Sequence, residues 1–221
     1  MSTPSPADLH PPLGLRVVCG PVELRGITDE LLVELGALAA EGIHDPAAMP
    51  FLHPWTDAPT AELPARLASY HWGLRAAFGP PAWALELAVL RDGEVVGVQG
   101  LHARDFAVTR SAATGSWLGR RHQGRGTGTL MRRAMCVLAF DHLGATEVTS
   151  GAFLDNPASL AVSRKVGYRP NGQRRVERRP GEVAIEQQLL LEPQDLVRPP
   201  RPVEVTGLAP VVDALGLVGL A

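Results

Sequence analysis

The chain has 221 residues and a formal net charge of −2, with 45% hydrophobic and 20% charged residues. This length is sufficient for one domain with a full hydrophobic core, and the near-neutral charge gives no reason to expect a nucleic-acid partner. No apolar run approaches the roughly 20 residues of a membrane-spanning helix, and the proline-rich N-terminus lacks the features of a signal peptide. From these two features we expect a protein of the bacterial cytoplasm with no membrane partner. Nearly all the basic residues are arginine, a bias typical of GC-rich genomes.

The N-terminal half is predicted to begin with a disordered leader at residues 1–13. Thr28 is a candidate helix cap ahead of an apolar stripe, and Pro64 suits the first turn of a second helix. The pair Asp92-Gly93 lies between two apolar runs, which is a strong signal for a β-hairpin. We therefore expect strands at 15–19, 22–25, 83–91 and 94–104, and helices at 28–41 and 60–78.

The C-terminal half continues with a long strand, a glycine-rich turn and a helix whose apolar residues recur with a period of 3.6. The sulfur-containing residues of this helix, Met131, Met135 and Cys136, are typical of a hydrophobic core, so no metal site is predicted. The other cysteine, Cys19, is likewise expected to be a buried free thiol. The expected elements are strands at 107–118, 147–153, 168–177 and 183–191, and helices at 126–143 and from 157.

This alternation of strands and helices predicts one mixed α/β domain over residues 14–192. The remaining segment, 193–221, begins with a proline-rich stretch and then offers a short candidate strand at 203–206. Covering an edge of the sheet and forming a contact in a homo-oligomer are both compatible with its sequence. The role of this C-terminal extension is therefore left open.

The most informative segment is the basic turn at 120–129, which reads Arg-Arg-His-Gln-Gly-Arg-Gly-Thr-Gly-Thr. It joins a predicted strand to a helix start, so several backbone N–H groups and the positive end of the helix dipole face one point. Glycine lets a ligand approach the backbone closely, and arginine suits phosphate. The turn lacks the lysine of a P-loop, and the spacing Gly124-x-Gly126-x-Gly128 differs from a dinucleotide fingerprint. We therefore predict a pyrophosphate-binding turn.

A second motif follows about 30 residues later, after the strand predicted at 147–153. Asn156 and Pro157 are typical of a helix start, and Gly167 is typical of a helix end. Helix capping explains these residues one by one. It does not explain why the two motifs occur in this order and at this distance.

Together the two motifs resemble the GCN5-related N-acetyltransferase (GNAT) superfamily. Gln123-x-x-Gly126-x-Gly128 is similar to its acyl-CoA-binding signature, and segment 156–168, with Asn-x-x-Ser near its start and Lys-x-Gly-Tyr at its end, is similar to a second conserved block. The resemblance covers residues 15–192 and is strongest to the branch of ribosomal-protein N-terminal acetyltransferases. The chain is also similar to a mycobacterial member that uses succinyl-CoA. The resemblance implies a twisted, mostly antiparallel sheet flanked by helices.

The resemblance further implies acetyl-CoA or succinyl-CoA as a co-substrate, with no metal. The N–H groups of the turn would hold the pyrophosphate, and the end of the preceding strand would leave backbone groups free for the pantetheine arm. Asn156 matches a position that hydrogen-bonds this arm, although it is also the candidate helix cap. The implied cofactor-binding residues are Leu118, Gly119, Arg120, Gln123, Gly124, Arg125, Gly126, Thr127, Gly128, Thr129, Asn156 and Ser159.

The implied reaction is direct attack of an amine on the CoA thioester within a ternary complex. The N–H of Leu118 is the candidate oxyanion donor, and Ser159 matches a position proposed to protonate the leaving thiolate. A serine in a first helical turn also satisfies local backbone groups. Segment 111–118 contains no carboxylate, so the usual general base is missing, and His102 is a candidate because histidine titrates near neutral pH. The alternatives are Asp105, Glu147, Asp155, an ordered water, or an amine of low pKa.

The acceptor is expected to be a small-molecule or peptide amine bound by the variable segment 41–57. Acetyl is the default acyl group, because succinyl needs a cationic or donor-rich pocket for its carboxylate. Two other functions stay open: a non-catalytic CoA-binding regulator on the same fold, and an NAD-binding oxidoreductase, which the glycines fit only loosely. Solvated loop charges explain most of the side chains of this segment that also suit a cationic acceptor: Glu41, His44, Asp45, His53 and Asp57.

Overall fold

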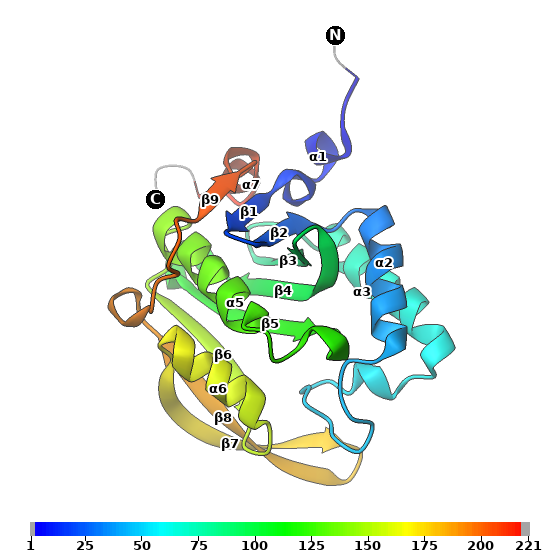
Figure 1. Cartoon of the computed structure of the whole chain (residues 1–221). Helices are drawn as coiled ribbons and strands as arrows, with labels where there is room; N and C mark the ends of the chain where they lie inside the picture. The colour runs from blue at the N-terminus through cyan, green and yellow to red at the C-terminus, as the bar shows by residue number, and fades with distance from the viewer. Residues whose placement is uncertain (1–2, 218–221) are drawn as a thin grey trace.

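The computed structural model describes residues 3–217, which form one sheet with helices on both sides (Figure 1). The strands are β1 (Arg16–Cys19), β2 (Val22–Gly26), β3 (Ala82–Arg91), β4 (Glu94–Arg104), β5 (Ser111–Leu118), β6 (Glu147–Phe153), β7 (Arg169–Arg179), β8 (Glu182–Leu191) and β9 (Glu204–Thr206). The α-helices are α1 (Pro6–Leu9), α2 (Asp29–Glu41), α3 (Leu63–Ala76), α4 (Phe106–Thr109), α5 (Thr127–Val137), α6 (Pro157–Val166) and α7 (Ala209–Ala214).

The sheet has the strand order β7-β8-β6-β5-β4-β3-β2-β1-β9. Within the described residues every neighbouring pair is antiparallel except β5 and β6, which run parallel. Helix α5 packs one large core against the sheet, and α2 packs a second core against the opposite face. The predicted mixed α/β fold, with a mostly antiparallel sheet flanked by helices, is confirmed.

Several predicted elements are found where local signals were strong. Thr28 caps α2 by accepting a hydrogen bond from the Leu31 N–H, at 3.3 Å. Asp92 and Gly93 have φ values of 52° and 87°, the left-handed pair that a two-residue hairpin turn between β3 and β4 requires. The two cysteines are buried free thiols, as predicted.

The long strand predicted at 107–118 is wrong in its first part. Residues Phe106–Thr109 form the short helix α4, and the strand begins only at Ser111. The reason is tertiary packing: Phe106 is buried and meets Trp83 edge-on, with 5.3 Å between ring centroids. Similarly, the helix predicted at 126–143 is regular only as α5, and a π-helical turn at Leu138–His142 follows it.

The predicted disordered leader is also wrong for the part that the structure describes; residues 1 and 2 lie outside it. Helix α1 and a 3-10 turn, η1 (Pro11–Gly14), precede β1, and Pro12 is buried. A Cβ at Gly26 would lie 2.2 Å from the Pro12 carbonyl oxygen, so only glycine permits this close contact. The leader is therefore packed against the start of the domain.

The C-terminal extension adds a strand to the sheet. Its strand β9 pairs antiparallel with β1, and Val211 of α7 is fully buried in the larger core. Of the two roles left open for the extension, covering a sheet edge is the one that the described residues show; residues 218–221 lie outside them.

No helix within residues 3–217 has the length and apolarity that crossing a membrane requires.

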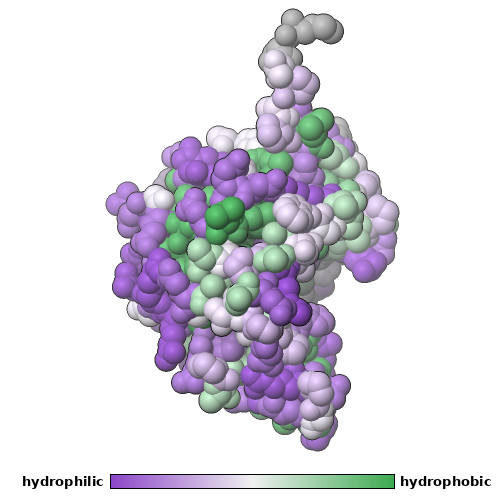
Figure 2. All heavy atoms as spheres, turned by 90° about the vertical axis from the view of Figure 1, so that its right-hand side faces the viewer, coloured by the Kyte–Doolittle hydropathy of each residue, from purple (hydrophilic) through white to green (hydrophobic). Residues whose placement is uncertain are grey.

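The face that carries α2 and α3 shows polar and hydrophobic residues side by side (Figure 2). Val33 of α2 and Trp72 of α3 are largely exposed there. On the same face of the sheet, Ala113 and Gly115 of β5 are exposed as well. Helices therefore leave this face open beside the middle of β5.

The sheet opens between β5 and β6, its two parallel strands. They pair over only three positions, Ser111–Ala113 with Glu147–Thr149. Beyond these positions β5 stays paired with β4 as far as Leu118, while β6 continues beside β8. The two strands therefore diverge and leave a wedge beneath α5 and α6 (Figure 1).

Candidate active site

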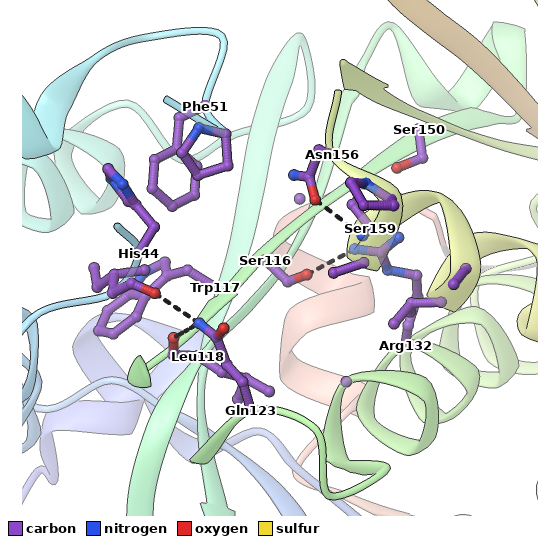
Figure 3. Close-up of a pocket in the computed structure, with 18 of the residues that line it drawn as sticks. His44, Phe51, Ser116, Trp117, Leu118, Gln123, Arg132, Ser150, Asn156 and Ser159 are labelled. Carbon is purple, nitrogen blue, oxygen red and sulfur yellow. Dashed lines mark hydrogen bonds between the residues drawn. The ribbon is translucent and has the colours of Figure 1, made fainter. Parts of the chain in front are cut away.

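A cavity of about 770 Å³ occupies this wedge, between β5, α5, α6 and the segment that follows α2. Figure 3 shows Asn156 and Ser159 on one side of it and His44 and Phe51 on the other. The structure brings most of the predicted cofactor-binding residues to this one place. Those that line the cavity are Leu118, Gln123, Gly124, Gly126, Gly128, Thr129, Asn156 and Ser159.

The glycine turn presents an open backbone to the cavity. Gly124 and Gly126 have φ values of 74° and 79°, a left-handed conformation that side chains other than glycine rarely adopt. A Cβ on either residue would have no heavy atom within 4 Å, so the space beside the turn is free. Gly126 is the N-cap of α5 and provides no capping side chain, so the first N–H groups of the helix are available to a ligand.

Side chains from three other segments hold this turn in place. The Gln123 side-chain amide donates to the carbonyl oxygens of Ile43, at 2.6 Å, and Leu118, at 2.9 Å. Arg91 of β3 donates to the Arg125 carbonyl oxygen and to the Thr127 hydroxyl, at 2.8 and 2.7 Å. Gln123 and Thr127 therefore shape the turn, and Thr127 and Arg125 do not line the cavity.

Gly119 and Arg120 also lie outside the cavity lining. The Gly119 N–H donates to the Val96 carbonyl oxygen and the Arg120 N–H donates to that of Gly42, at 2.9 and 3.0 Å. Both donors are occupied within the chain. The expectation that these two N–H groups are free for a pantetheine arm is therefore wrong.

The N–H of Leu118 does face the wedge. Because Gly119 bonds to β4 and bonded positions alternate along an antiparallel pair, the backbone groups of Leu118 point away from β4. The same alternation turns the N–H of Ser116 toward the wedge. Ser116 was not predicted from the sequence, although the two-residue period of a strand would have indicated it once Leu118 was chosen.

Asn156 serves as the helix cap and still reaches the cavity. Its side-chain oxygen accepts a hydrogen bond from the Ser159 N–H at 3.1 Å, and both residues line the cavity, half-buried. Capping uses only the oxygen of the carboxamide, so the NH₂ group remains a donor for a ligand. The two roles that the sequence left in competition are therefore compatible.

Of the four candidate side-chain bases, only Asp155 lines the cavity, and it forms an ion pair with Arg178 at 2.7 Å. Glu147 lies at the other end of its strand and accepts a hydrogen bond from Ser111. Asp105 precedes α4 and does not line the cavity. Of these four candidates, the fold therefore brings Asp155 to the wedge.

His102 lies on the other face of the sheet, where its Nε2 is 2.5 Å from Glu86 Oε1. Burial lowers the pKa of His102, but the hydrogen bond and the negative charge of Glu86 outweigh it and raise the pKa above its ordinary value. His102 does not line the cavity, but it is the register partner of Ala113 across β4 and β5, on the open face beside the wedge.

Aromatic residues connect the segment after α2 to β5. Ring centroids are 5.6 Å apart for His44 and Phe51, 5.4 Å for Phe51 and Trp55, and 5.9 Å for Trp55 and Trp117. Of the five charged or histidine side chains proposed for the amine site, His44 alone lines the cavity in the described chain. Asp57 instead pairs with Arg179 at the tip of the β7–β8 hairpin. This side of the cavity is therefore mainly apolar, and most of the five side chains are loop charges outside it.

Comparison with known proteins connects this geometry to a family. A family model described as an acetyltransferase (GNAT) domain matches residues 22–169, more than half of the chain. The chain belongs to the GNAT acetyltransferase family. Both the glycine turn and the Asn156 helix fall within the matched residues, so the cavity is part of the GNAT domain.

Relatives of this GNAT chain include proteins named for ribosomal substrates. YdaF of Bacillus subtilis, whose name places it with ribosomal N-acetyltransferases, is 32% identical over 91 residues, or 41% of this chain and 49% of YdaF. The match therefore spans about half the length of that relative. RimL, named as a ribosomal L7/L12 acetyltransferase and solved with coenzyme A, is 18% identical with a TM-score of 0.64, covering 79% of this chain and 96% of RimL.

Mycobacterium smegmatis RimJ, solved with a CoA disulfide, has a TM-score of 0.61 at 18% identity, covering 91% of this chain and 92% of RimJ. At these identities the structures show that the fold is shared. The resemblance to ribosomal-protein acetyltransferases is thus supported at the level of family and fold.

The GNAT cavity contains one buried cation that the sequence did not indicate. Arg132 of α5 is 6% exposed; it donates from Nη2 to the Ser116 hydroxyl and from Nη1 to the Ser163 hydroxyl, at 2.8 and 3.0 Å. Nothing in its local sequence distinguishes it from Arg133, which follows directly and does not line the cavity.

The nearest thiol is not a nucleophile. Cys136 is fully buried behind the cavity, and burial raises its pKa to about 11. Its sulfur lies 3.6 Å from the Tyr168 hydroxyl, whose own pKa is raised by burial. Both groups are therefore neutral near pH 7, and neither favours a covalent acyl-enzyme.

Proposed function

We propose that this GNAT protein transfers an acyl group from acyl-CoA to the amine of an acceptor. The observation that carries the proposal is the uncapped N-terminus of α5, which opens on a cavity formed where β5 and β6 diverge. Free N–H groups at a helix start are suited to the pyrophosphate of CoA. The residues present therefore fit the co-substrate, with the open space beside Gly124 and Gly126 admitting the phosphates.

The reaction we propose is a direct attack. The acceptor nitrogen forms a bond to the thioester carbonyl carbon while its oxygen gains negative charge, and the N–H groups of Leu118 and Ser116 stabilise that charge. The C–S bond then breaks, and the Ser159 hydroxyl gives the departing thiolate a proton and takes a proton back from water. Asn156 holds the pantetheine arm through its free NH₂ group. The amine proton leaves to water, because Asp155, the carboxylate that lines the cavity in the described chain, is already paired.

The acceptor, we propose, is a peptide N-terminus or a small amine that enters from the face carrying α2. That face is open at Ala113 and Gly115, and the aromatic residues His44, Phe51 and Trp55 stand beside it. The names of YdaF and RimL favour a protein acceptor. For the donor, acetyl and succinyl are the two groups that the sequence resemblance implies.

The test is a titration of the purified full-length protein with CoA, acetyl-CoA and NAD by calorimetry, followed by an assay of thiol release from acetyl-CoA and succinyl-CoA. The assay uses a panel of amines and peptides with free N-termini. We expect CoA to bind more tightly than NAD and at least one amine to release thiol. Binding without release from any amine would favour a CoA-binding regulator, and no binding of CoA would refute the proposal.

A further inference from the structure

The cavity lining holds a positive charge that has no acidic partner within residues 3–217. Arg132 is 6% exposed, and its two described partners, the hydroxyls of Ser116 and Ser163, are neutral. Its Nε is buried and has no hydrogen-bond partner within residues 3–217. Figure 3 shows the side chain reaching from α5 toward Ser116, between β5 and α6.

The buried guanidinium of Arg132 therefore lacks a counter-charge among the described residues. Hydroxyl groups satisfy N–H donors but do not neutralise a charge, and buried charges in proteins are usually paired with an opposite charge. Asp155, the carboxylate that lines the cavity in the described chain, is already bonded to Arg178. Lys165 adds a further cation to the lining. The cavity is therefore prepared for an anion.

Two parts of an acyl-CoA carry suitable anions: the phosphates, and a carboxylate at the end of the acyl group. The phosphates fit the start of α5, whereas Arg132 comes six residues after the N-cap Gly126, roughly 9 Å further along the helix axis. Its partner Ser116 is one of the two residues whose N–H we assigned to the thioester oxygen. The charge therefore lies beside the proposed thioester position, within reach of the end of a short acyl chain.

We infer that Arg132 binds the terminal carboxylate of the acyl group, so that the preferred donor is the CoA thioester of a short dicarboxylic acid, such as succinyl-CoA. This inference rests on the proposed function, since it needs CoA in the wedge. The guanidinium presents paired donors to a carboxylate, and the hydroxyls of Ser116 and Ser163 hold its orientation.

Arg133 provides a matched control. It is the next residue of α5 and also has a buried Nε, but its Nη2 donates to the Lys165 carbonyl oxygen at the C-terminal end of α6. It does not line the cavity. Replacing it removes an arginine of the same helix without changing the charge that faces a ligand.

The experiment is calorimetry of CoA, acetyl-CoA and succinyl-CoA with the full-length protein and its Arg132→Met, Arg132→Lys and Arg133→Met variants. We expect the unchanged protein to bind succinyl-CoA about tenfold to a hundredfold more tightly than acetyl-CoA, as a charge-assisted hydrogen-bonded pair provides. Arg132→Met should abolish this preference and keep the affinity for CoA. Arg132→Lys should retain part of the preference, and Arg133→Met all of it.

Each contrary result has a distinct meaning. Equal affinity of the unchanged protein for the two acyl-CoAs overturns the inference, even if Arg132→Met fails to fold. If a folded Arg132→Met variant loses the same affinity for all three ligands, the arginine binds the phosphates, and the inference is again overturned. If CoA itself does not bind, the proposed function fails before acyl preference is reached. Thermal unfolding of each variant, followed by circular dichroism, identifies a folding defect.

Discussion

Gly126 offers the most direct test of CoA binding at the start of α5. Its φ of 79° costs a residue other than glycine about 1–2 kcal/mol, while a carboxylate at a helix N-terminus recovers about 0.3–1 kcal/mol. No heavy atom lies within 4 Å of the added Cβ, so Gly126→Glu causes no clash. The variant should therefore fold, with a free energy of unfolding lower by about 1 kcal/mol.

The effect on CoA binding should be larger. A carboxylate about 5 Å from a phosphate charge, at an effective dielectric constant of about 20, opposes binding by about 3 kcal/mol. This energy corresponds to an affinity roughly a hundredfold lower, and the loss should shrink in concentrated salt as the charges are screened. Gly126→Ala is the matched control, because it carries the same backbone cost without the charge.

The measurement is calorimetric titration of CoA into the unchanged protein and both variants, at low and high salt, with denaturant unfolding in parallel. The expected order of affinity is unchanged protein, then Gly126→Ala, then Gly126→Glu by a wide margin. A Gly126→Glu variant that binds CoA normally would show that the phosphates lie elsewhere. An equal loss in both variants would show that space, and not charge, decides binding at this turn.

Two further predictions follow from the site and its surroundings. Ser159→Ala should lower the turnover number for thiol release by about a hundredfold or more, as loss of a general acid does. The affinity for CoA, measured by calorimetry, should stay within about twofold. Normal turnover would remove Ser159 from the reaction. Because Glu86 raises the pKa of His102 in the folded protein, His102 adds stability below its unfolded pKa of about 6.5, and this contribution is lost as the pH rises through the folded value. His102→Asn should therefore reduce the free energy of unfolding more at pH 5.5 than at pH 9, and denaturant titrations showing the opposite trend would contradict the pairing with Glu86.

Where the signal for an element is local, the sequence predicts it well. The Asp92-Gly93 turn places both hairpin strands, and Thr28 places the start of α2, because each acts on backbone groups within a few residues. The boundaries predicted for β6, 147–153, agree with the structure. The glycine turn and the Asn156 cap also depend on local signals, which is why part of the cavity lining on the side of α5 and α6 was predicted.

Where a contact with a residue far away along the chain determines the local structure, the prediction from sequence was wrong. Residues 107–109 have a composition suited to a strand, yet burial of Phe106 against Trp83 makes them helical. The leader lacks any periodic pattern, yet it packs where Gly26 leaves room for Pro12. In both cases the partner is far away along the chain, and intrinsic preference is weaker than packing.

The amino-acid sequence alone determined the order of the longer elements and the glycine turn that suits a pyrophosphate, since these depend on periodicity and on short motifs. Two of those motifs also carried the resemblance to the family. The tertiary structure decided which backbone N–H groups face the wedge, because the direction of each one depends on the register of β5 against β4. It also decided that Arg132 is buried beside Ser116 and Ser163 while Arg133 is not part of the cavity. Whether a charge is paired depends on residues brought together from β5, α5 and α6, and no local pattern contains that information.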